Sequence, residues 1–343
     1  MLFSLKVIFF GSIYLLILNY FQVKKNFLLD KITKMEVHKA LLNTETKIPL
    51  SGISYFLPII FILLYQSHFY LTLFCTIFFI IGIFSDSKIL GSPKLRLLSQ
   101  FLILLIFLIM NDQVIIDTRI QFLNSLLGNE ILRIFIISFF FLVLINGFNF
   151  IDGVNNLCSL NFLIVLIFLF FLSMDINIKI FNKEIYSLIL FLLVFVIFNF
   201  FGKNFLGDSG VYGLSFLIGY ISIVYTSSEI KISPYFIANL LWYPAFENLF
   251  SIIRRSIVNK KNYLPDNEHL HQLIFKYLNS KNWIKKKYLL SSLTGILINF
   301  YLFIGYLIGY SNYSETYFQV IIIFINVTIY LFIYYSLKNK FNV

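Results

Sequence analysis

The amino-acid sequence predicts an all-α membrane protein that crosses the bilayer about eleven times. Hydrophobic residues make up 59% of the chain and charged residues only 13%, and the mean hydropathy is +0.86. A soluble domain is about half apolar and about a quarter charged. So much apolar surface cannot all be buried inside one core of 343 residues. Lipid is therefore expected to solvate much of it.

Apolar windows of about 17 to 22 residues, the length that crosses a bilayer as a helix, mark the expected spans. The first, residues 2–21, resembles a signal peptide but has no small-x-small cleavage site, so an uncleaved helix is expected. The others lie near residues 50–65, 69–84, 96–111, 131–148, 156–173, 185–200, 210–226, 233–256, 288–309 and 317–337. Because no internal repeat or soluble domain interrupts them, residues 1–343 are expected to form one integral-membrane domain.

The basic residues indicate how these spans are oriented. When the connections alternate between two sides, most of the 27 lysines and arginines fall on one side. Positively charged connections stay in the cytoplasm, so the N-terminus is expected in the periplasm and the C-terminus in the cytoplasm. This topology, with attraction to anionic membrane lipids, explains the net charge of +11. Nucleic-acid binding is not expected, because no basic loop has a recognisable binding fold.

The polar motifs all fall on the cytoplasmic side of this topology. They occupy the connections at about residues 23–49, 85–95, 148–156, 201–209 and 257–287. No periplasmic connection carries a comparable cluster. Acids gathered at one boundary indicate a site at the membrane surface.

Three polar residues in the third connection recur at a spacing of three. Asn146, Asn149 and Asp152 would therefore share one broad face of a helix. They could simply join helices through hydrogen bonds. An acid and two amides followed by Gly153 are more typical of a ligand-binding helix end, because polar groups near hydrocarbon are costly unless they are used.

Two further acids have both a structural and a functional interpretation. Asp208 follows Gly207 and begins a new apolar helix, where an aspartate suits the N-cap. It equally suits a metal site at a helix start, where free N–H groups also favour phosphate. Asp86 would be an ordinary boundary acid if it did not lie on the same side as Asp152 and Asp208.

A histidine pair lies in the last cytoplasmic connection. His269 and His271 are two residues apart, so they share a face only in extended or loop backbone. A zinc pair usually has helical spacing. Binding of a phosphate beside Arg254 and Arg255 is therefore the preferred interpretation.

Taken in order, these motifs resemble the polyprenyl-phosphate N-acetylhexosamine-1-phosphate transferase family, which includes the phospho-MurNAc-pentapeptide translocase and the WecA-type enzymes. The family's N-x-x-N-x-x-D-G pattern matches the segment from Asn146 to Gly153, and its F-M-G-D-x-G pattern matches the segment from Phe205 to Gly210. Its H-x-H motif matches His269 and His271. The pentapeptide branch has three consecutive histidines there, so the chain is more similar to the WecA-type capsule or O-antigen branch.

The resemblance implies a role for each matched residue. Asp208 and Asp152 would hold Mg²⁺, with Mn²⁺ as an alternative, and Phe205 would stack on uracil. The implied catalytic residues are Asp86, Asp152, Asp208, His269 and His271. The implied substrate-binding residues are Lys47, Asn146, Asn149, Asn155, Asn199, Phe205, Arg254 and Arg255. Two positions depart from the family pattern, because Ser85 and Asn155 each stand where an aspartate is common.

The reaction implied is transfer of N-acetylhexosamine-1-phosphate from a UDP-N-acetylhexosamine to undecaprenyl or another polyprenyl phosphate, with release of UMP. It would begin cell-surface polysaccharide synthesis at the cytoplasmic face of a bacterial inner membrane. One alternative is a lipid-linked glycan flippase, which should carry its acids near the middle of the bilayer. The other is an inactive relative of the family. This alternative remains because Ser85 and Asn155 stand where an aspartate is common. The sequence leaves the sugar undefined, and a homodimer is kept as an option.

Overall fold

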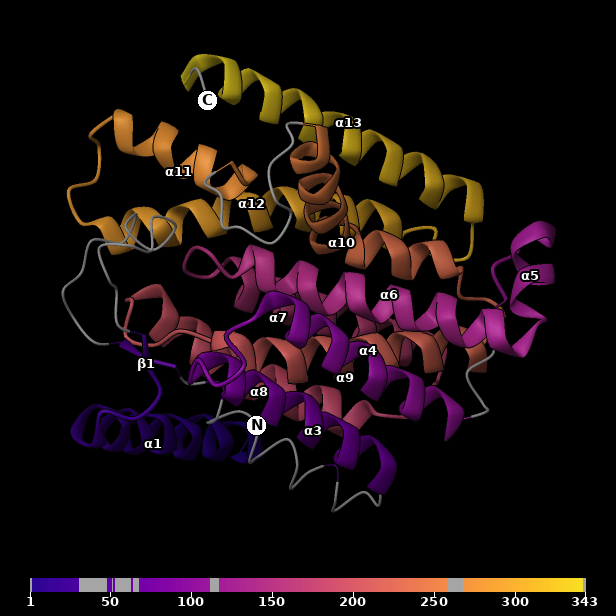
Figure 1. Cartoon of the computed structure of the whole chain (residues 1–343), viewed down its shortest axis with the longest axis horizontal. Helices are drawn as coiled ribbons and strands as arrows, with labels where there is room; N and C mark the ends of the chain where they lie inside the picture. The colour runs from indigo at the N-terminus through magenta and orange to yellow at the C-terminus, as the bar shows by residue number, and fades with distance from the viewer. Residues whose placement is uncertain are drawn as a thin grey trace.

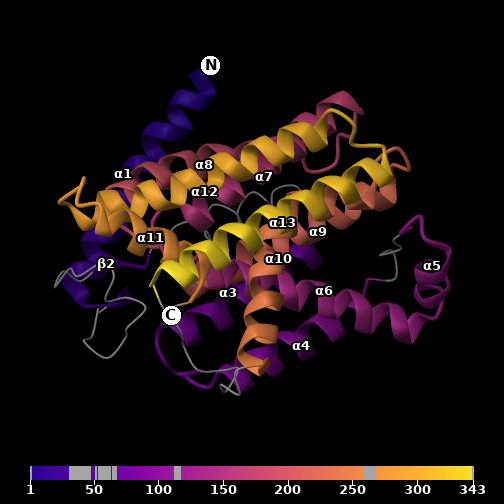
Figure 2. The ribbon, with the colours of Figure 1, turned by 90° about the horizontal axis from the view of Figure 1, so that it is seen from above.

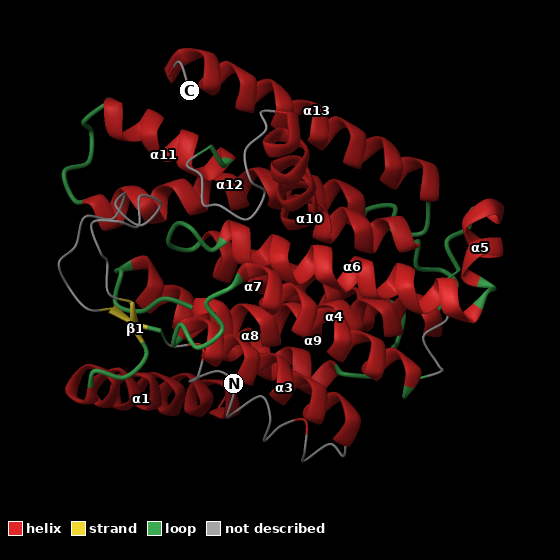
Figure 3. Cartoon of the chain, viewed as in Figure 1, coloured by secondary structure: helices red, strands yellow, loops and turns green. Residues whose placement is uncertain are grey.

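The computed structural model describes residues 2–30, 48–50, 52, 63, 68–111, 117–257 and 268–341. In this part of the chain nearly all regular structure is α-helical (Figure 3). Two short strands, β1 (Leu29–Asp30) and β2 (Ile48–Pro49), pair antiparallel. The prediction of an all-α polytopic membrane protein is confirmed at this level.

Most helices follow the apolar windows of the sequence. The helices are α1 (Leu2–Lys25), α3 (Phe69–Asp86), α4 (Pro93–Ile109), α5 (Gln121–Leu127), α6 (Glu130–Ile151), α7 (Leu157–Asp175), α8 (Asn182–Phe200), α9 (Gly207–Ser228), α10 (Pro234–Ile257), α11 (Leu270–Ser280), α12 (Lys287–Tyr310) and α13 (Thr316–Phe341). The exceptions are α5 and α11, which form in segments that were predicted to be connections.

Among the described residues, eight of these helices are long and apolar enough to cross a membrane. They are α3, α6, α7, α8, α9, α10, α12 and α13. The expected span at 50–65 lies almost entirely outside the described residues. The count of eleven and the orientation of the termini therefore stay predictions.

The long helices run side by side, with α5 at one end of the bundle and β1 and α11 at the other (Figure 1). An aromatic cluster joins four of them in the core. The ring of Phe216 in α9 lies 4.7 Å from that of Phe78 in α3, 5.0 Å from that of Phe107 in α4 and 5.5 Å from that of Phe141 in α6. The ends of these four helices supply the polar cluster described below.

Two glycines allow helices to approach closely near that cluster. A Cβ at Gly82 would lie 2.3 Å from the Cα of Ser209, so only glycine lets α3 pack against the start of α9 at this distance. A Cβ at Gly147 would lie 2.2 Å from the carbonyl oxygen of Pro244. Pro244 lies inside α10, and the helix changes direction along its length (Figure 2). The segment after Pro244 carries the charged residues of α10.

Candidate functional site

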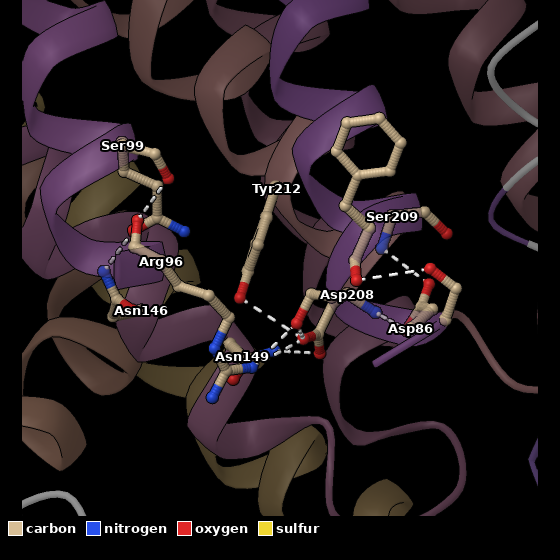
Figure 4. A network of polar contacts seen from close by, with 12 residues as sticks. Asp86, Arg96, Ser99, Asn146, Asn149, Asp208, Ser209 and Tyr212 are labelled. Carbon is tan, nitrogen blue, oxygen red and sulfur yellow. Dashed lines mark hydrogen bonds and ion pairs between the residues drawn. The ribbon is translucent and has the colours of Figure 1, made fainter. Parts of the chain in front are cut away.

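Asp208 lies in the first turn of α9, where its carboxylate accepts hydrogen bonds from four side chains (Figure 4). Asn149 Nδ2 donates to Oδ1 at 2.6 Å, and Arg96 Nη1 donates to Oδ2 at 2.9 Å. The hydroxyl groups of Ser85 and Tyr212 donate to Oδ2 as well. The donors come from α3, α4, α6 and α9, so the structure brings together motifs that are far apart in the sequence.

Asp86, at the end of α3, caps the helix that contains Asp208. Its Oδ1 accepts the backbone N–H of Asp208 at 2.9 Å, and its Oδ2 accepts that of Ser209 at 3.0 Å. These are orphan donors at a helix N-terminus, where a negative charge is favoured. Gly207 has a φ of +74° and a Cβ there would lie 3.0 Å from Asp86 Oδ2, so the turn requires glycine. Asp86 therefore caps α9, a role for which the sequence had suggested Asp208.

A second cluster surrounds His269, the N-cap residue of α11. Its Nδ1 lies 2.9 Å from Oε1 of Glu247 in α10. Its Nε2 lies 3.5 Å from Arg255 Nη2. The ring of His271 stacks on it, with centroids 5.5 Å apart and an interplanar angle of 13°. The two predicted histidines thus lie together with Arg255, as the sequence led us to expect.

The end of α6 joins the two clusters through neighbouring residues. Asn149 bonds to Asp208, while the ring of Phe150 lies 5.5 Å from that of His269. A Cβ at Gly153 would lie 2.4 Å from Nε2 of His271. Asp152, between them in the sequence, is the C-cap residue of α6. The N-x-x-N-x-x-D-G segment therefore contacts the aspartate cluster on one side. On the other side it contacts His269 and His271 at the start of α11, which we call the histidine loop.

Three predicted substrate-binding residues have partners within the protein. Asn146 Nδ2 donates to Gln100 Oε1 at 2.9 Å, which joins α6 to α4. Asn199 Oδ1 accepts the N–H of Asn156 at 2.6 Å, and its Nδ2 donates to a backbone carbonyl oxygen at 2.7 Å. Arg254 Nη1 donates to the Tyr334 hydroxyl at 2.7 Å. These contacts give each residue a structural role, and their contacts with substrate stay predictions.

A cavity of about 640 Å³ lies between α1, the end of α8 and the start of α12. Its wall includes Phe205, Lys203, Tyr288 and Asn155. The Asn155 Nδ2 lies 3.4 Å from the carbonyl oxygen of Tyr288, whereas its buried Oδ1 accepts no hydrogen bond from the described residues. A hydrogen-bond acceptor and an aromatic ring beside one cavity can recognise a flat heterocycle. Lys47 lies outside the described residues.

Sequence reasoning gave no functional role to two charged residues of these clusters, Arg96 and Glu247. Arg96 was counted only among the charges that set topology, although it lies on the same connection as Asp86. Glu247 lies within an apolar span and is completely buried. An acid in such a position is costly unless it is paired, and this was the signal that could have identified it.

The donor chemistry at Asp208 fits the Mg²⁺ that the family resemblance implies. Mg²⁺ prefers carboxylate oxygen, and the Asp208 side chain is 22% exposed, although the Arg96 guanidinium pairs with Oδ2 and would compete with a metal ion. In the described ranges no three His, Cys, Asp or Glu side chains are grouped around one point. Asp208 would therefore bind the ion with help from substrate or water oxygens, and Arg96 would have to release Oδ2.

Comparison with known proteins finds similarity to sugar-1-phosphate transferases. Residues 68–226 match the family model described as glycosyl transferase family 4. The chain is 25% identical over 229 residues to an undecaprenyl-phosphate alpha-N-acetylglucosaminyl 1-phosphate transferase of Thermotoga maritima, over 66% of this chain and 67% of that relative. It is 28% identical over 224 residues to a phospho-N-acetylmuramoyl-pentapeptide-transferase of Dictyoglomus thermophilum, over 62% and 71% respectively. The family match includes Asp86, Asn149, Asp152 and Asp208, and it ends before the histidine loop.

Proposed function

We propose that the chain, whose residues 68–226 match the glycosyl transferase family 4 model, transfers an N-acetylhexosamine-1-phosphate from a UDP-sugar to undecaprenyl or another polyprenyl phosphate, releasing UMP. One observation carries the proposal. The end of α6 contacts Asp208 through Asn149, and the histidine loop through Phe150 and Gly153. The elements expected to hold a metal-bound diphosphate and a lipid phosphate therefore lie side by side.

Charge is the main obstacle to this reaction. The lipid phosphate and the diphosphate are both anionic, and two unit charges about 4 Å apart repel by about 4 kcal/mol at an effective dielectric constant near 20. Arg96 and Arg255 supply fixed positive charge next to the two clusters, and His271 adds a ring that can hydrogen-bond phosphate oxygen. The family resemblance implies that Asp208 and Asp152 would hold Mg²⁺. The bound ion would supply further positive charge to the diphosphate.

The attacking group needs little activation in this mechanism. A phosphate monoester has a second pKa of about 6, so the lipid phosphate is largely dianionic near neutral pH. A strong general base is then unnecessary. Asp86 is used to cap α9, and Ser85 donates a hydrogen bond to Asp208, so neither has to remove a proton. We assign Asp86 the positioning of Asp208.

The cavity beside Phe205 is the proposed nucleoside site. Small-molecule pockets usually enclose about 300 to 1,000 Å³, so its volume suits a nucleoside. The Phe205 ring would stack on uracil, and Asn155, on the wall of the same cavity, would lie beside the base. Lys203, on the same wall, would meet the diphosphate that follows the ribose.

The positions of the acids favour a transferase over a flippase. Asp86 is the last residue of α3, Asp152 is the C-cap of α6, and Asp208 is the second residue of α9. All three lie at helix ends, whereas a transport path places acids near the middle of the bilayer. We propose that this end of the bundle faces the cytoplasm of a bacterial inner membrane, in agreement with the excess of basic residues on that side.

A direct assay tests the proposal. Purified protein in bilayer nanodiscs receives undecaprenyl phosphate, Mg²⁺ and one labelled UDP-N-acetylhexosamine at a time. The expected result is lipid-linked sugar and UMP in equal amounts for at least one sugar, which also identifies the substrate. Translocation of a lipid-linked sugar with no UMP formed would support the flippase instead. Tight substrate binding without turnover would support an inactive relative.

A further inference from the structure

Three side chains on one face of the C-terminal helix α13 reach toward the histidine loop. Tyr330, Tyr334 and Lys338 are each four residues apart, so they lie one above the other on the helix. α13 runs across α10 and toward α11, the two helices that hold the histidine cluster (Figure 2). The opposite face of α13 is apolar and exposed, as at Phe324 and Phe332, which suits contact with lipid.

The first contact supports His269 directly. The Tyr330 hydroxyl donates to Oε2 of Glu247 at 2.7 Å, and Oε1 of the same carboxylate lies 2.9 Å from His269 Nδ1. The Arg255 guanidinium has only donor atoms and faces Nε2 at 3.5 Å, an arrangement that suits a ring whose Nδ1 donates to Glu247. Glu247 is completely buried, so each oxygen needs its partner. Tyr330 and Glu247 together fix the orientation of the His269 ring.

The second and third contacts hold Glu268, the residue that precedes His269. The Tyr334 hydroxyl accepts a hydrogen bond from Arg254 Nη1 at 2.7 Å, and Arg254 donates to the backbone carbonyl of Glu268. Lys338 Nζ lies 3.2 Å from the Glu268 carboxylate. The backbone and the side chain of Glu268 are thus both tied to the α13 face.

We propose that α13 is a positioning element for His269, acting through the contact of Tyr330 with Glu247 and through the attachment of Glu268. The inference rests on the proposed function, because it assigns His269 a task in phosphosugar transfer. Tyr330 and Tyr334 touch no reacting group themselves, and their hydroxyl groups act through Glu247 and Arg254. A helix that served only as packing would need the rings of these tyrosines but not their hydroxyl groups.

Removing the hydroxyl groups tests the kinetic consequence. Tyr330→Phe keeps the ring that packs on Phe246 and Phe250 but removes the donor to Glu247. We expect kcat to fall about tenfold or more, the loss of one hydrogen bond to a charged group, with KM for the UDP-sugar unchanged; the melting temperature should also fall, because a buried oxygen of Glu247 loses its donor. Tyr335→Phe is the matched control, since Tyr335 lies on the same helix and is 52% exposed. Equal kcat values for Tyr330→Phe and the control would overturn the proposal.

A labelling experiment tests the positioning without any turnover. Diethyl pyrocarbonate modifies imidazole rings, and the His269 side chain is only 8% exposed, whereas the His68 side chain is 32% exposed and serves as an internal reference. The ratio of modification at His269 to that at His68 should rise at least threefold in the Tyr330→Phe/Tyr334→Phe double variant and stay unchanged in Tyr335→Phe. An unchanged ratio in the double variant would contradict the proposal. If the ratio rises but the wild-type protein forms no lipid-linked sugar, the proposed function fails and the positioning of His269 stands.

Discussion

The carboxylate of Asp86 accepts the backbone N–H of Asp208, 122 residues away in the sequence. Because of this contact, the two acids belong to one site and have different roles in it. Asp86 holds the first turn of α9 in place, and the Asp208 carboxylate remains directed toward Arg96, Asn149 and the other donors around it. The predictions below follow from this division of roles.

Replacing Asp86 should weaken the site without destroying it. Asp86→Asn keeps one acceptor for the N–H groups of α9 but loses the negative charge at the helix start. Loss of a good N-cap costs about 1 kcal/mol, so we expect a lower melting temperature and reduced but measurable transfer. The measurement is thermal unfolding together with kcat for the purified variant. A stable Asp86→Asn protein with no transfer at all would instead identify Asp86 as the proton acceptor.

Arg96 should compete with Mg²⁺ for Asp208. In Arg96→Gln the guanidinium no longer pairs with Oδ2, and partly exposed ion pairs are worth about 0.2 to 1 kcal/mol. The dissociation constant for Mn²⁺, measured by electron paramagnetic resonance as a stand-in for Mg²⁺, should fall about two- to fivefold. At saturating metal the transfer rate should fall, because the diphosphate loses a cation. Lys94→Gln removes the same charge from the same helix and should leave the metal affinity unchanged; equal shifts in both variants would refute the competition.

A single methyl group at Gly153 should disrupt the histidine loop. In Gly153→Ala the new Cβ would lie 2.4 Å from Nε2 of His271, so the ring must move. We expect transfer to slow at least tenfold, close to the effect of His271→Ala, because the ring leaves its place in the site. Gly91→Ala is the control, since its Cβ would meet no atom closer than 3.4 Å. If Gly153→Ala keeps the wild-type rate, the packing of the loop against α6 has no part in the reaction.

The nucleoside cavity gives a prediction about substrate affinity. Stacking of a base on an aromatic ring is worth about 1 to 3 kcal/mol, so Phe205→Ala should raise KM for the UDP-sugar roughly tenfold or more. Phe205→Tyr keeps the stacking surface and should restore KM. Steady-state kinetics and inhibition by free UMP measure both effects. A KM that does not change in Phe205→Ala would place uracil elsewhere.

Local patterns in the sequence predicted much of the fold and part of the site. Apolar windows predicted most of the helices, and a spacing of three placed Asn146 and Asn149 on the side of α6 that meets α4 and Asp208. The H-x-H motif beside Arg254 and Arg255 pointed to His269 and His271, whose rings the structure places together.

The remaining contacts join helices that are distant in the sequence, and no local rule reports them. Capping rules look only a few residues ahead, so they suggested Asp208 as the cap of its own helix, although Asp86 of α3 makes that cap. Arg96 was explained by the excess of positive charge in cytoplasmic loops, which hid its ion pair with Asp208. The contact of Tyr330 with Glu247 needs α13 to lie against α10, which composition does not determine.

The central claim is that Asp208 organises a site for phosphosugar transfer, and one comparison tests it most directly. Purified wild-type protein and Asp208→Asn are given labelled UDP-N-acetylhexosamine, undecaprenyl phosphate and Mg²⁺ in the same nanodiscs, and UMP and lipid-linked sugar are measured. We predict equal amounts of both products from the wild type and none above background from a folded, inserted Asp208→Asn protein. Turnover by Asp208→Asn at a rate close to that of the wild type would contradict the account.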